Sequence, residues 1–280
     1  MSLSHFLLVL LSGLLHASWN ILAKKTGKNI TVLWLGTSIV GLSILPFVIT
    51  SIPTHLLKIS LLWGILSGIV HIFYYLALTH AYYHFPLSHI YPISRGLGIV
   101  GASIFGIIAL HDTLSLLGSL AIMAVLIGIS LYFYDSKTSQ SSHKSILWGC
   151  IVGLSIALYL ITDILAIRYV NASSHVILLF LTMNICLLPY FIFKHKKEMI
   201  EGFCKHKKYA IAIGSFSLLS YALILIVLRS NPVSYVLSLR ECSIVISALF
   251  AVWILKEKIS VKKCIAILCI CLGAIGLKLS

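Results

Sequence analysis

The chain has 280 residues, of which 60% are hydrophobic and only 10% are charged. Soluble domains have roughly 25% charged and about 45–50% apolar residues, so this composition excludes a disordered or nucleic-acid-binding chain and argues against a soluble enzyme. The 21 Lys and Arg residues outnumber the 7 Asp and Glu residues, which gives a formal net charge of +14. Because many apolar runs are long enough to cross a bilayer, the basic residues are interpreted by their position relative to a membrane.

Long apolar runs separated by polar breaks predict about ten membrane-spanning helices, and therefore an all-α membrane protein. In chain order the runs are His5–Ala23, Ile30–Ile52, Ile59–Thr79, Pro86–Ala109, Leu114–Tyr134, Ile146–Ile167, Ala172–Phe193, Tyr209–Leu228, Val233–Leu255 and Val261–Leu279. The first run has no basic residues before it and no clear cleavage site, so it is interpreted as a retained helix. Asp135–Ser145 and Lys194–Lys208 are the longest stretches predicted to lie outside the helices.

The loop lysines predict how the chain is oriented in the membrane. Most of them follow the first, fifth, seventh and ninth predicted helices, and few basic residues fall on the other side. The lysine-rich side is expected to be cytoplasmic, so both termini are expected to lie outside a bacterial inner (plasma) membrane. The expected partners are the lipid bilayer and a small-molecule substrate, with no nucleic acid, and the protein is expected to be a monomer or homodimer.

The seven cysteines form no CxxC pair, and most of them lie in or beside apolar runs. They are interpreted as small buried hydrophobic residues. His80 and His84 have a spacing that suits a metal, but two ligands without a third are weak evidence. No metal site and no cofactor are predicted.

The sequence contains an internal repeat with an offset of about 143–146 residues. His16-Ala-Ser-Trp-Asn-Ile-Leu-Ala in the first predicted helix matches Tyr159-Leu-Ile-Thr-Asp-Ile-Leu-Ala in the sixth. The predicted division is a five-helix repeat at 1–135, a linker at 136–145 and a second repeat at 146–280. Because five is odd, the second repeat enters the membrane from the opposite side, as in many secondary transporters with a substrate site near the midplane.

The chain resembles the drug/metabolite transporter superfamily, specifically its EamA type. The residues that carry the resemblance are Leu110–Ser115, Leu255–Ser260, Trp19, Asn20, Pro86 and Pro232. The two segments follow a Leu-x-[Asp/Glu]-x-[Leu/Ile]-Ser pattern, with Asp112 where Glu is usual. The resemblance implies ten helices in two inverted repeats around a central cavity. Many relatives are described with both termini cytoplasmic, which is the opposite of what the lysines predict here.

Polar and aromatic residues within the predicted helices are candidates for a substrate site, because ionisable groups in a membrane are costly and face a cavity or a partner. The candidate substrate-binding residues are His16, Trp19, Asn20, His71, Tyr74, Tyr75, Tyr91, Arg95, Tyr159, Asp163, Tyr221, Tyr235 and Glu241. Several of them recur at i, i+3 and i+4, so they share helix faces. The alternative is that some of the tyrosines only pack between helices and that His71 only bridges two of them.

Asp163 and Glu241 are also candidates for proton coupling, because a carboxylate in a partly dry cavity can exchange a proton. The structural alternative pairs Asp163 with Arg95 or Arg240 in an ion pair that fixes helix register. Arg240 and Glu241 are adjacent on a predicted helix and should point about 100° apart, so only one of them should face a given spot.

These features predict a secondary transporter, with export of a small organic metabolite by alternating access and with proton coupling as an option. Aromatic rings and carboxylates suit a cationic or aromatic cargo, and arginines suit an acidic group, so an amino-acid-like cargo satisfies both. The alternative is a non-transporting membrane protein that binds lipid or serves in assembly, or a flippase for a lipid-linked substrate. The chain has no Walker-type phosphate loop and no HExxH or GxSxG motif, so neither ATP hydrolysis nor a catalytic residue is predicted.

Overall fold

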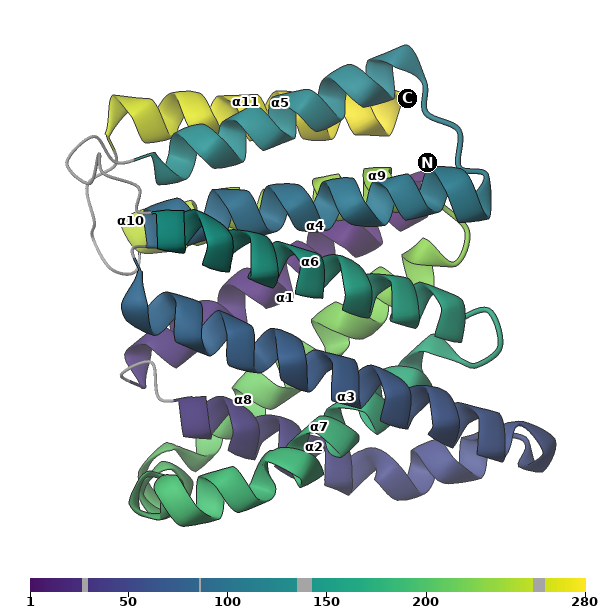
Figure 1. Ribbon diagram of the computed structural model, residues 1–280, viewed down its shortest axis with the longest axis vertical. Helices are drawn as coiled ribbons and strands as arrows, with labels where there is room; N and C mark the ends of the chain where they lie inside the picture. Colours follow the sequence, from purple (N-terminus) through teal and green to yellow (C-terminus); the bar gives the residue numbers. More distant parts are fainter. Residues whose placement is uncertain (27–29, 86, 135–142, 254–259) are drawn as a thin grey trace. The chain divides into compact units, whose positions relative to one another are not determined.

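The computed structural model describes residues 1–26, 30–85, 87–134, 143–253 and 260–280, and these ranges form helices joined by short connections (Figure 1). The helices are α1 (Leu3–Lys25), α2 (Ile30–Ser51), α3 (Thr54–His84), α4 (Leu87–Leu110), α5 (Leu116–Phe133), α6 (His143–Ala166), α7 (Ala172–Lys194), α8 (Lys196–Leu228), α9 (Val233–Arg240), α10 (Cys242–Trp253) and α11 (Val261–Leu279). Within the described ranges, nine helical segments are long and apolar enough to span a membrane. The predicted all-α membrane fold of about ten helices is confirmed.

The outer surfaces of the helices carry large apolar side chains. Phe47, Phe193 and Trp253 are 75%, 84% and 76% exposed, and many leucines and isoleucines are also exposed. A soluble monomer rarely exposes contiguous apolar surface on this scale, whereas a bilayer solvates it. The protein is therefore a multi-pass membrane protein.

The polar stretch Lys194–Lys208 was predicted to lie outside the helices, but most of it is helical because α8 begins at Lys196. The Lys205 ammonium donates to the Glu201 carboxylate at 2.5 Å, one helical turn away, and pairs of this kind stabilise a polar helix surface. Hydrogen bonding to Lys205 also holds the pKa of the Glu201 carboxyl below its usual range. His206 has non-helical backbone angles (φ −121°, ψ 17°), which mark a kink before the apolar part of the helix.

The ninth predicted helix, Val233–Leu255, is interrupted at Glu241, where α9 ends and α10 follows. The Glu241 N–H donates to the Ser238 carbonyl at 3.2 Å, and the Ile244 N–H donates to the Glu241 carbonyl at 2.9 Å. Both bonds span three residues, which is the 3₁₀ pattern, and such a turn inside a longer helix often occurs at a functional hinge. Residues 254 and 255 of the predicted helix lie outside the described ranges.

The chain forms two compact units. The first unit comprises Met1–Leu10, Phe73–Ile161 and Ser230–Ser280, and the second comprises Leu11–Ile72 and Thr162–Arg229. Each unit takes segments from both halves of the sequence, so the compact units do not test the repeats at 1–135 and 146–280, which stay a prediction. Residues 136–142 of the predicted linker lie outside the described ranges, and residues 143–145 begin α6.

In the first unit, the segment Leu110–Ser115 connects the ends of three helices. Asp112 Oδ2 accepts a hydrogen bond of 2.8 Å from the Val233 N–H at the start of α9, and Ser115 caps α5 by accepting from the Gly118 N–H at 3.0 Å. Ser260 caps α11 in the same way. Capping satisfies N–H groups that would otherwise be unpaired in an apolar environment. The acidic residue and the serine of this motif therefore have a structural role here, while Glu257 of the second motif lies outside the described ranges.

Close helix packing in both units depends on glycine. In the first unit α5 and α11 lie side by side (Figure 1), and a Cβ on Gly273 would lie 2.7 Å from the Ala121 carbonyl oxygen. In the second unit α2 packs on α8, where a Cβ on Gly36 would lie 2.1 Å from the Ala210 carbonyl oxygen and one on Gly214 would lie 2.2 Å from the Gly36 oxygen. Small residues let membrane helices approach closely, which strengthens their van der Waals contact.

Replacing Gly36 with alanine is expected to destabilise the protein by roughly 1–3 kcal/mol, because the added methyl group forces α2 and α8 apart. Gly96→Ala is the matched control, because a Cβ on Gly96 has nothing within 4 Å. Thermal unfolding of the purified protein in detergent measures both effects. A Gly36→Ala variant as stable as Gly96→Ala would contradict the close α2–α8 packing.

Candidate functional site

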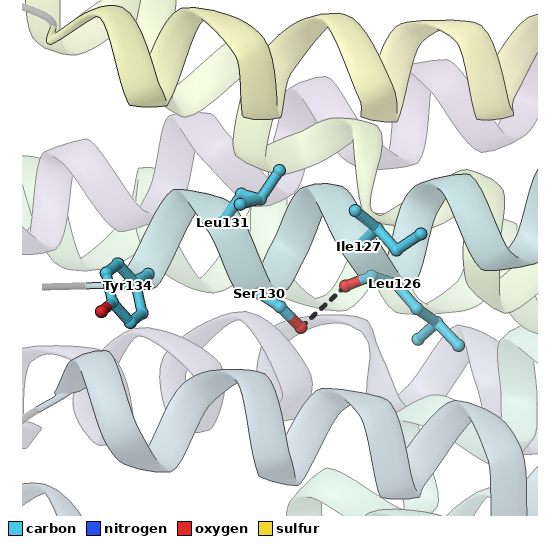
Figure 2. A pocket seen from close by; sticks show the side chains of 5 residues that line it. All are labelled: Leu126, Ile127, Ser130, Leu131 and Tyr134. Carbon is cyan, nitrogen blue, oxygen red and sulfur yellow. Dashed lines mark hydrogen bonds between the residues drawn. The ribbon is translucent and has the colours of Figure 1, made fainter.

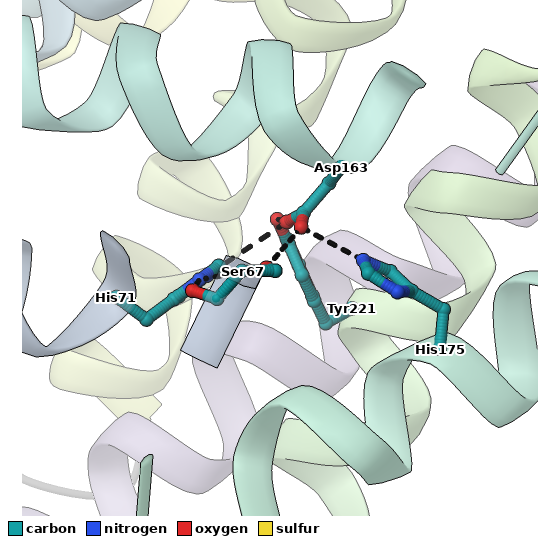
Figure 3. Close-up of polar contacts among 5 residues, drawn as sticks. All are labelled: Ser67, His71, Asp163, His175 and Tyr221. Atoms are coloured by element: carbon teal, nitrogen blue, oxygen red, sulfur yellow. Dashed lines mark hydrogen bonds and ion pairs between the residues drawn. The ribbon is translucent and has the colours of Figure 1, made fainter. Parts of the chain in front are cut away.

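Asp163 is the centre of a buried polar cluster in the second unit (Figure 3). The hydroxyl groups of Ser67 and Tyr221 donate hydrogen bonds to its two carboxylate oxygens, Oδ1 and Oδ2 respectively. The Nε2 atom of His175 lies 2.9 Å from Oδ1, and the Nε2 atom of His71 lies 3.8 Å from Oδ2. Asp163 and His175 are both 0% exposed. We call these five residues the Asp163 cluster.

Four helices supply the Asp163 cluster. Ser67 and His71 are four residues apart on α3 and therefore share one face, Asp163 lies on α6, His175 lies in the first turn of α7, and Tyr221 lies on α8. The start of α7 is fixed by a side-chain cap, in which Asn171 accepts a hydrogen bond from the Ser173 N–H at 2.9 Å. This cap fixes the residue at which α7 begins, and it therefore fixes the position of His175 in the first turn of the helix.

Both histidines of the Asp163 cluster direct their Nε2 atom toward the carboxylate, but at different distances. His71 Nδ1 lies 2.9 Å from the Ser67 carbonyl oxygen, and since a carbonyl can only accept, Nδ1 carries a proton. His175 Nε2 is the donor to Asp163 for the same reason. His175 Nδ1 is buried and has no hydrogen-bond partner in the part of the chain that the structure describes. This lone nitrogen can accept a proton or a hydrogen bond from a ligand hydroxyl.

The Asp163 cluster can bind hydroxyl groups and exchange protons. A carboxylate and two imidazoles offer three sites at which a proton can reside, and imidazole is the side chain that changes charge most readily near neutral pH. Among the described residues no group of three or more His, Cys, Asp or Glu side chains has an arrangement suited to a metal ion. The side chains that are present in the Asp163 cluster can form hydrogen bonds and transfer protons.

Three members of the Asp163 cluster, His71, Asp163 and Tyr221, were among the candidate residues predicted from the sequence, whereas Ser67 and His175 were not. Both missed residues lie within apolar runs, so the same signal that selected Asp163, a polar group inside a membrane span, could have found His175. Ser67 could have been found from its position one turn before His71.

A second polar group lies in the first unit, around a small cavity between α4, α6 and α9. The cavity is lined by Arg95, Ile99, Ile156, Tyr159, Leu160, Leu237, Arg240 and Glu241, and we call it the arginine cavity. Arg95 Nη1 lies 3.8 Å from Glu241 Oε1, and the Arg95 guanidinium lies 5.2 Å from the centre of the Tyr91 ring. Tyr91 in turn stacks on Phe133 at 4.2 Å, which holds the ring beneath the guanidinium.

The expectation that only one of Arg240 and Glu241 faces a given spot is wrong, because both line the arginine cavity. The physical reason is the interruption between α9 and α10. Glu241 is the C-cap of α9, with φ −67° and ψ −6°, so Arg240 and Glu241 are not successive residues of one regular α-helix, which is what the predicted 100° step assumed. The sequence contains no Pro or Gly at this position that would have predicted the turn.

The remaining candidate residues of the first unit are tyrosines. In the first unit, the centres of the Tyr74 and Tyr159 rings are 5.0 Å apart. Tyr75 lies in the same unit and is half-buried on α3. Tyr235 accepts a hydrogen bond from the Ser115 N–H at 3.0 Å and so holds the start of α5.

In the second unit the candidates on α1 differ from their counterparts on α6. The His16 and Trp19 rings meet edge to face at 5.1 Å, and the Asn20 amide donates to the His16 carbonyl at 2.7 Å. Asn20 is exposed, whereas Asp163, its counterpart in the predicted repeat, is fully buried. Roles in substrate binding for these residues stay predictions.

A shallow groove on α5 is lined by Leu126, Ile127, Ser130, Leu131 and Tyr134 (Figure 2). The Ser130 hydroxyl in this groove donates a hydrogen bond of 2.9 Å to the Leu126 carbonyl of the same helix. Because the groove is apolar and belongs to one helix, it fits lipid chains better than a polar cargo.

Membrane-length helices that enclose buried ionisable groups are the organisation of a membrane transport protein. The sequence model of the family described as "Sugar transport protein" matches residues 7–279, and the chain belongs to this family. This family consists of membrane transporters, so the chain is a membrane transport protein. No curated protein matches the chain.

Solved structures support the fold. One of them, described only as "Crystal structure of protein", superposes with a TM-score of 0.74 and 16% sequence identity, and the match covers 100% of this chain and 98% of the other. At this identity the similarity shows a shared fold and carries no information on cargo.

Proposed function

We propose that this protein is a secondary transporter that carries a sugar across the membrane by alternating access and that protons drive or regulate the transport. The single observation that carries the proposal is the Asp163 cluster, a fully buried carboxylate in contact with two imidazoles and two hydroxyls. The description of the family as "Sugar transport protein" supports a sugar as the cargo. The EamA type, the inverted repeats and the outside position of both termini belong to this proposal.

The chemistry of the Asp163 cluster supports a polyhydroxylated cargo. Sugars are recognised by groups that accept and donate hydrogen bonds to hydroxyls, and carboxylate, imidazole and hydroxyl groups do both. His175 Nδ1 offers an acceptor without a partner in the described part of the chain. When a sugar hydroxyl or a proton occupies this acceptor, the charge distribution around Asp163 changes, and this links cargo binding to protonation.

The alternative cargo is the amino-acid-like, cationic or aromatic metabolite suggested by the sequence, moved outward. The aromatic residues Tyr91 and Tyr159 and the carboxylate of Glu241 favour it, because rings and carboxylates attract cations. A flippase or a lipid-binding subunit is the second alternative, and the apolar groove on α5 is the feature that favours it.

Counterflow in proteoliposomes tests the proposal. Vesicles that contain the purified protein and are preloaded with glucose are expected to accumulate labelled glucose, and an imposed pH gradient is expected to change the rate. The direction in which the gradient drives accumulation distinguishes uptake from export. Counterflow of a labelled amino acid without counterflow of glucose would replace the sugar with the alternative cargo, and movement of a fluorescent lipid alone would favour a flippase.

A further inference from the structure

A lysine-rich stretch joins α7 to α8 in the second unit and lies at one surface of the membrane. The span formed by α7 ends at Lys194, and the next span begins at Cys204, within α8. Charged residues between two successive spans cannot lie in the hydrocarbon core, so they lie among the lipid headgroups or just beyond them. We call residues 194–208 the α8 basic segment.

The α8 basic segment carries an excess of positive charge. Its charged residues are six lysines and two glutamates, which gives a formal net charge of +4 with neutral histidines. The lysines are all exposed, and they are Lys194, Lys196, Lys197, Lys205, Lys207 and Lys208. Ion pairs within the segment, such as the one between Lys205 and Glu201, are already included in this net charge. The remaining acidic residue of the second unit is Asp163, which is fully buried, so no other carboxylate of this unit neutralises the excess.

The α8 basic segment also presents apolar surface at the level of the headgroups. The Ile200 side chain is 57% exposed. Gly202 packs on α2, where a Cβ on Gly202 would lie 3.3 Å from Leu35 and 3.4 Å from Val32, so this part of α8 is held against the bundle. The non-helical backbone at His206 lets it take a different direction from the span that follows. An exposed isoleucine among lysines suits the boundary between acyl chains and headgroups, because lysine stems are apolar and their ammonium groups reach the phosphates.

We propose that the α8 basic segment is a binding surface for the headgroups of anionic lipids, such as phosphatidylglycerol. The ammonium groups donate hydrogen bonds to the headgroup phosphate and are attracted by its negative charge. A zwitterionic headgroup has no net charge, so the segment binds it more weakly. Ile200 contacts the acyl chains of the bound lipids.

Basic residues at the other membrane surface provide a comparison within the same unit. Arg168 lies before α7, Arg229 follows α8, and Lys58 lies in the second turn of α3. The starts of α3 and α7 lie at the same surface, because both line one cavity together with the end of α2. All three residues are exposed, but they are spread over three connections instead of forming one segment. They therefore distinguish a clustered lysine surface from a general attraction between basic residues and the membrane.

Association of spin-labelled lipids with the purified full-length protein in phosphatidylcholine nanodiscs tests the proposal. Labelled phosphatidylglycerol is expected to associate roughly fivefold or more tightly than labelled phosphatidylcholine, which is the effect of a single lysine near an anionic surface. High salt is expected to reduce this preference, because it screens exposed charges. Combining Lys196→Gln, Lys197→Gln and Lys208→Gln is expected to remove most of it.

The matched control combines Lys58→Gln, Arg168→Gln and Arg229→Gln. It removes the same charge from the other surface and is expected to keep the preference for phosphatidylglycerol. Equal association of the two lipids with the wild-type protein, or an undiminished preference in the variant of the α8 basic segment, overturns the proposal. Equal losses in the two variants also overturn it, because total charge and not the segment then sets the preference.

Free phosphate is the other source of the same chemistry. Displacement of labelled phosphatidylglycerol by inorganic phosphate, but not by sodium chloride of equal ionic strength, overturns the lipid surface in favour of a site for the free anion. Equal displacement by the two salts supports the lipid surface. If the variant with three substitutions does not fold, Lys197→Gln and Lys208→Gln are compared singly with Arg168→Gln, and a loss of preference only in the lysine variants supports the proposal. Equal preference in all three single variants overturns it.

Discussion

Replacing Asp163 with asparagine is expected to remove the pH dependence of transport and to weaken substrate binding by roughly 10- to 150-fold. The factor corresponds to the loss of a charge-assisted hydrogen bond of about 1.5–3 kcal/mol. The amide oxygen still accepts a hydrogen bond from Ser67 or Tyr221, so the variant is expected to fold. It cannot take up a proton, so the link between protonation and cargo is lost. Uptake of labelled sugar between pH 5 and pH 8 measures both effects.

Asp112→Asn is the matched control for this experiment. Asp112 accepts a hydrogen bond from the Val233 N–H and lies in the first unit, outside the Asp163 cluster. The asparagine oxygen can replace that acceptor, so the control is expected to keep the wild-type pH profile. If Asp163→Asn also keeps the wild-type affinity and pH profile, Asp163 has only a structural role, and Glu241 becomes the leading candidate for proton coupling.

The helices and the centre of the candidate site could be predicted because each depends on local sequence. A run of about 20 apolar residues must be helical in a bilayer, since only a helix satisfies its own backbone there. Asp163 stands out because a carboxylate inside such a run needs a partner or water. Tyr221 and His71 were selected because they are aromatic or polar residues within predicted helices, and both contact Asp163 in the structure.

The surroundings of these residues could not be predicted because they depend on which helix faces meet. The proposed partners of Asp163 were arginines, whereas the structure surrounds it with imidazole and hydroxyl groups, and Arg95 pairs with Glu241. The sequence identifies the charged residues that could attract one another. Helix packing determines which of them lie close enough to form a pair. The turn at Glu241 was missed for a related reason, since its backbone hydrogen bonds are set by packing and not by a proline or glycine.

Replacing His175 with glutamine is expected to flatten the pH profile of transport while the protein stays folded. The glutamine amide nitrogen can take the position of Nε2 and donate to Asp163, so the hydrogen bond of 2.9 Å is kept. The amide cannot bind a proton as imidazole does, so the proton shared between His175 and Asp163 is lost. Transport driven by a pH gradient is expected to fall at least tenfold, while counterflow without a gradient falls much less.

His71→Gln is the matched comparison, because it removes a second buried histidine from the same cluster. His71 Nε2 lies 3.8 Å from Asp163 and makes no direct hydrogen bond to it, whereas Nδ1 is held by the Ser67 carbonyl. This variant is expected to slow transport a few fold and to keep the wild-type pH profile. The reverse result is a flattened pH profile in His71→Gln and a normal profile in His175→Gln. It would indicate that Asp163 shares its proton with His71 on α3 and not with His175. Normal profiles in both variants would leave His175 as a positioning residue that holds the carboxylate without sharing its proton.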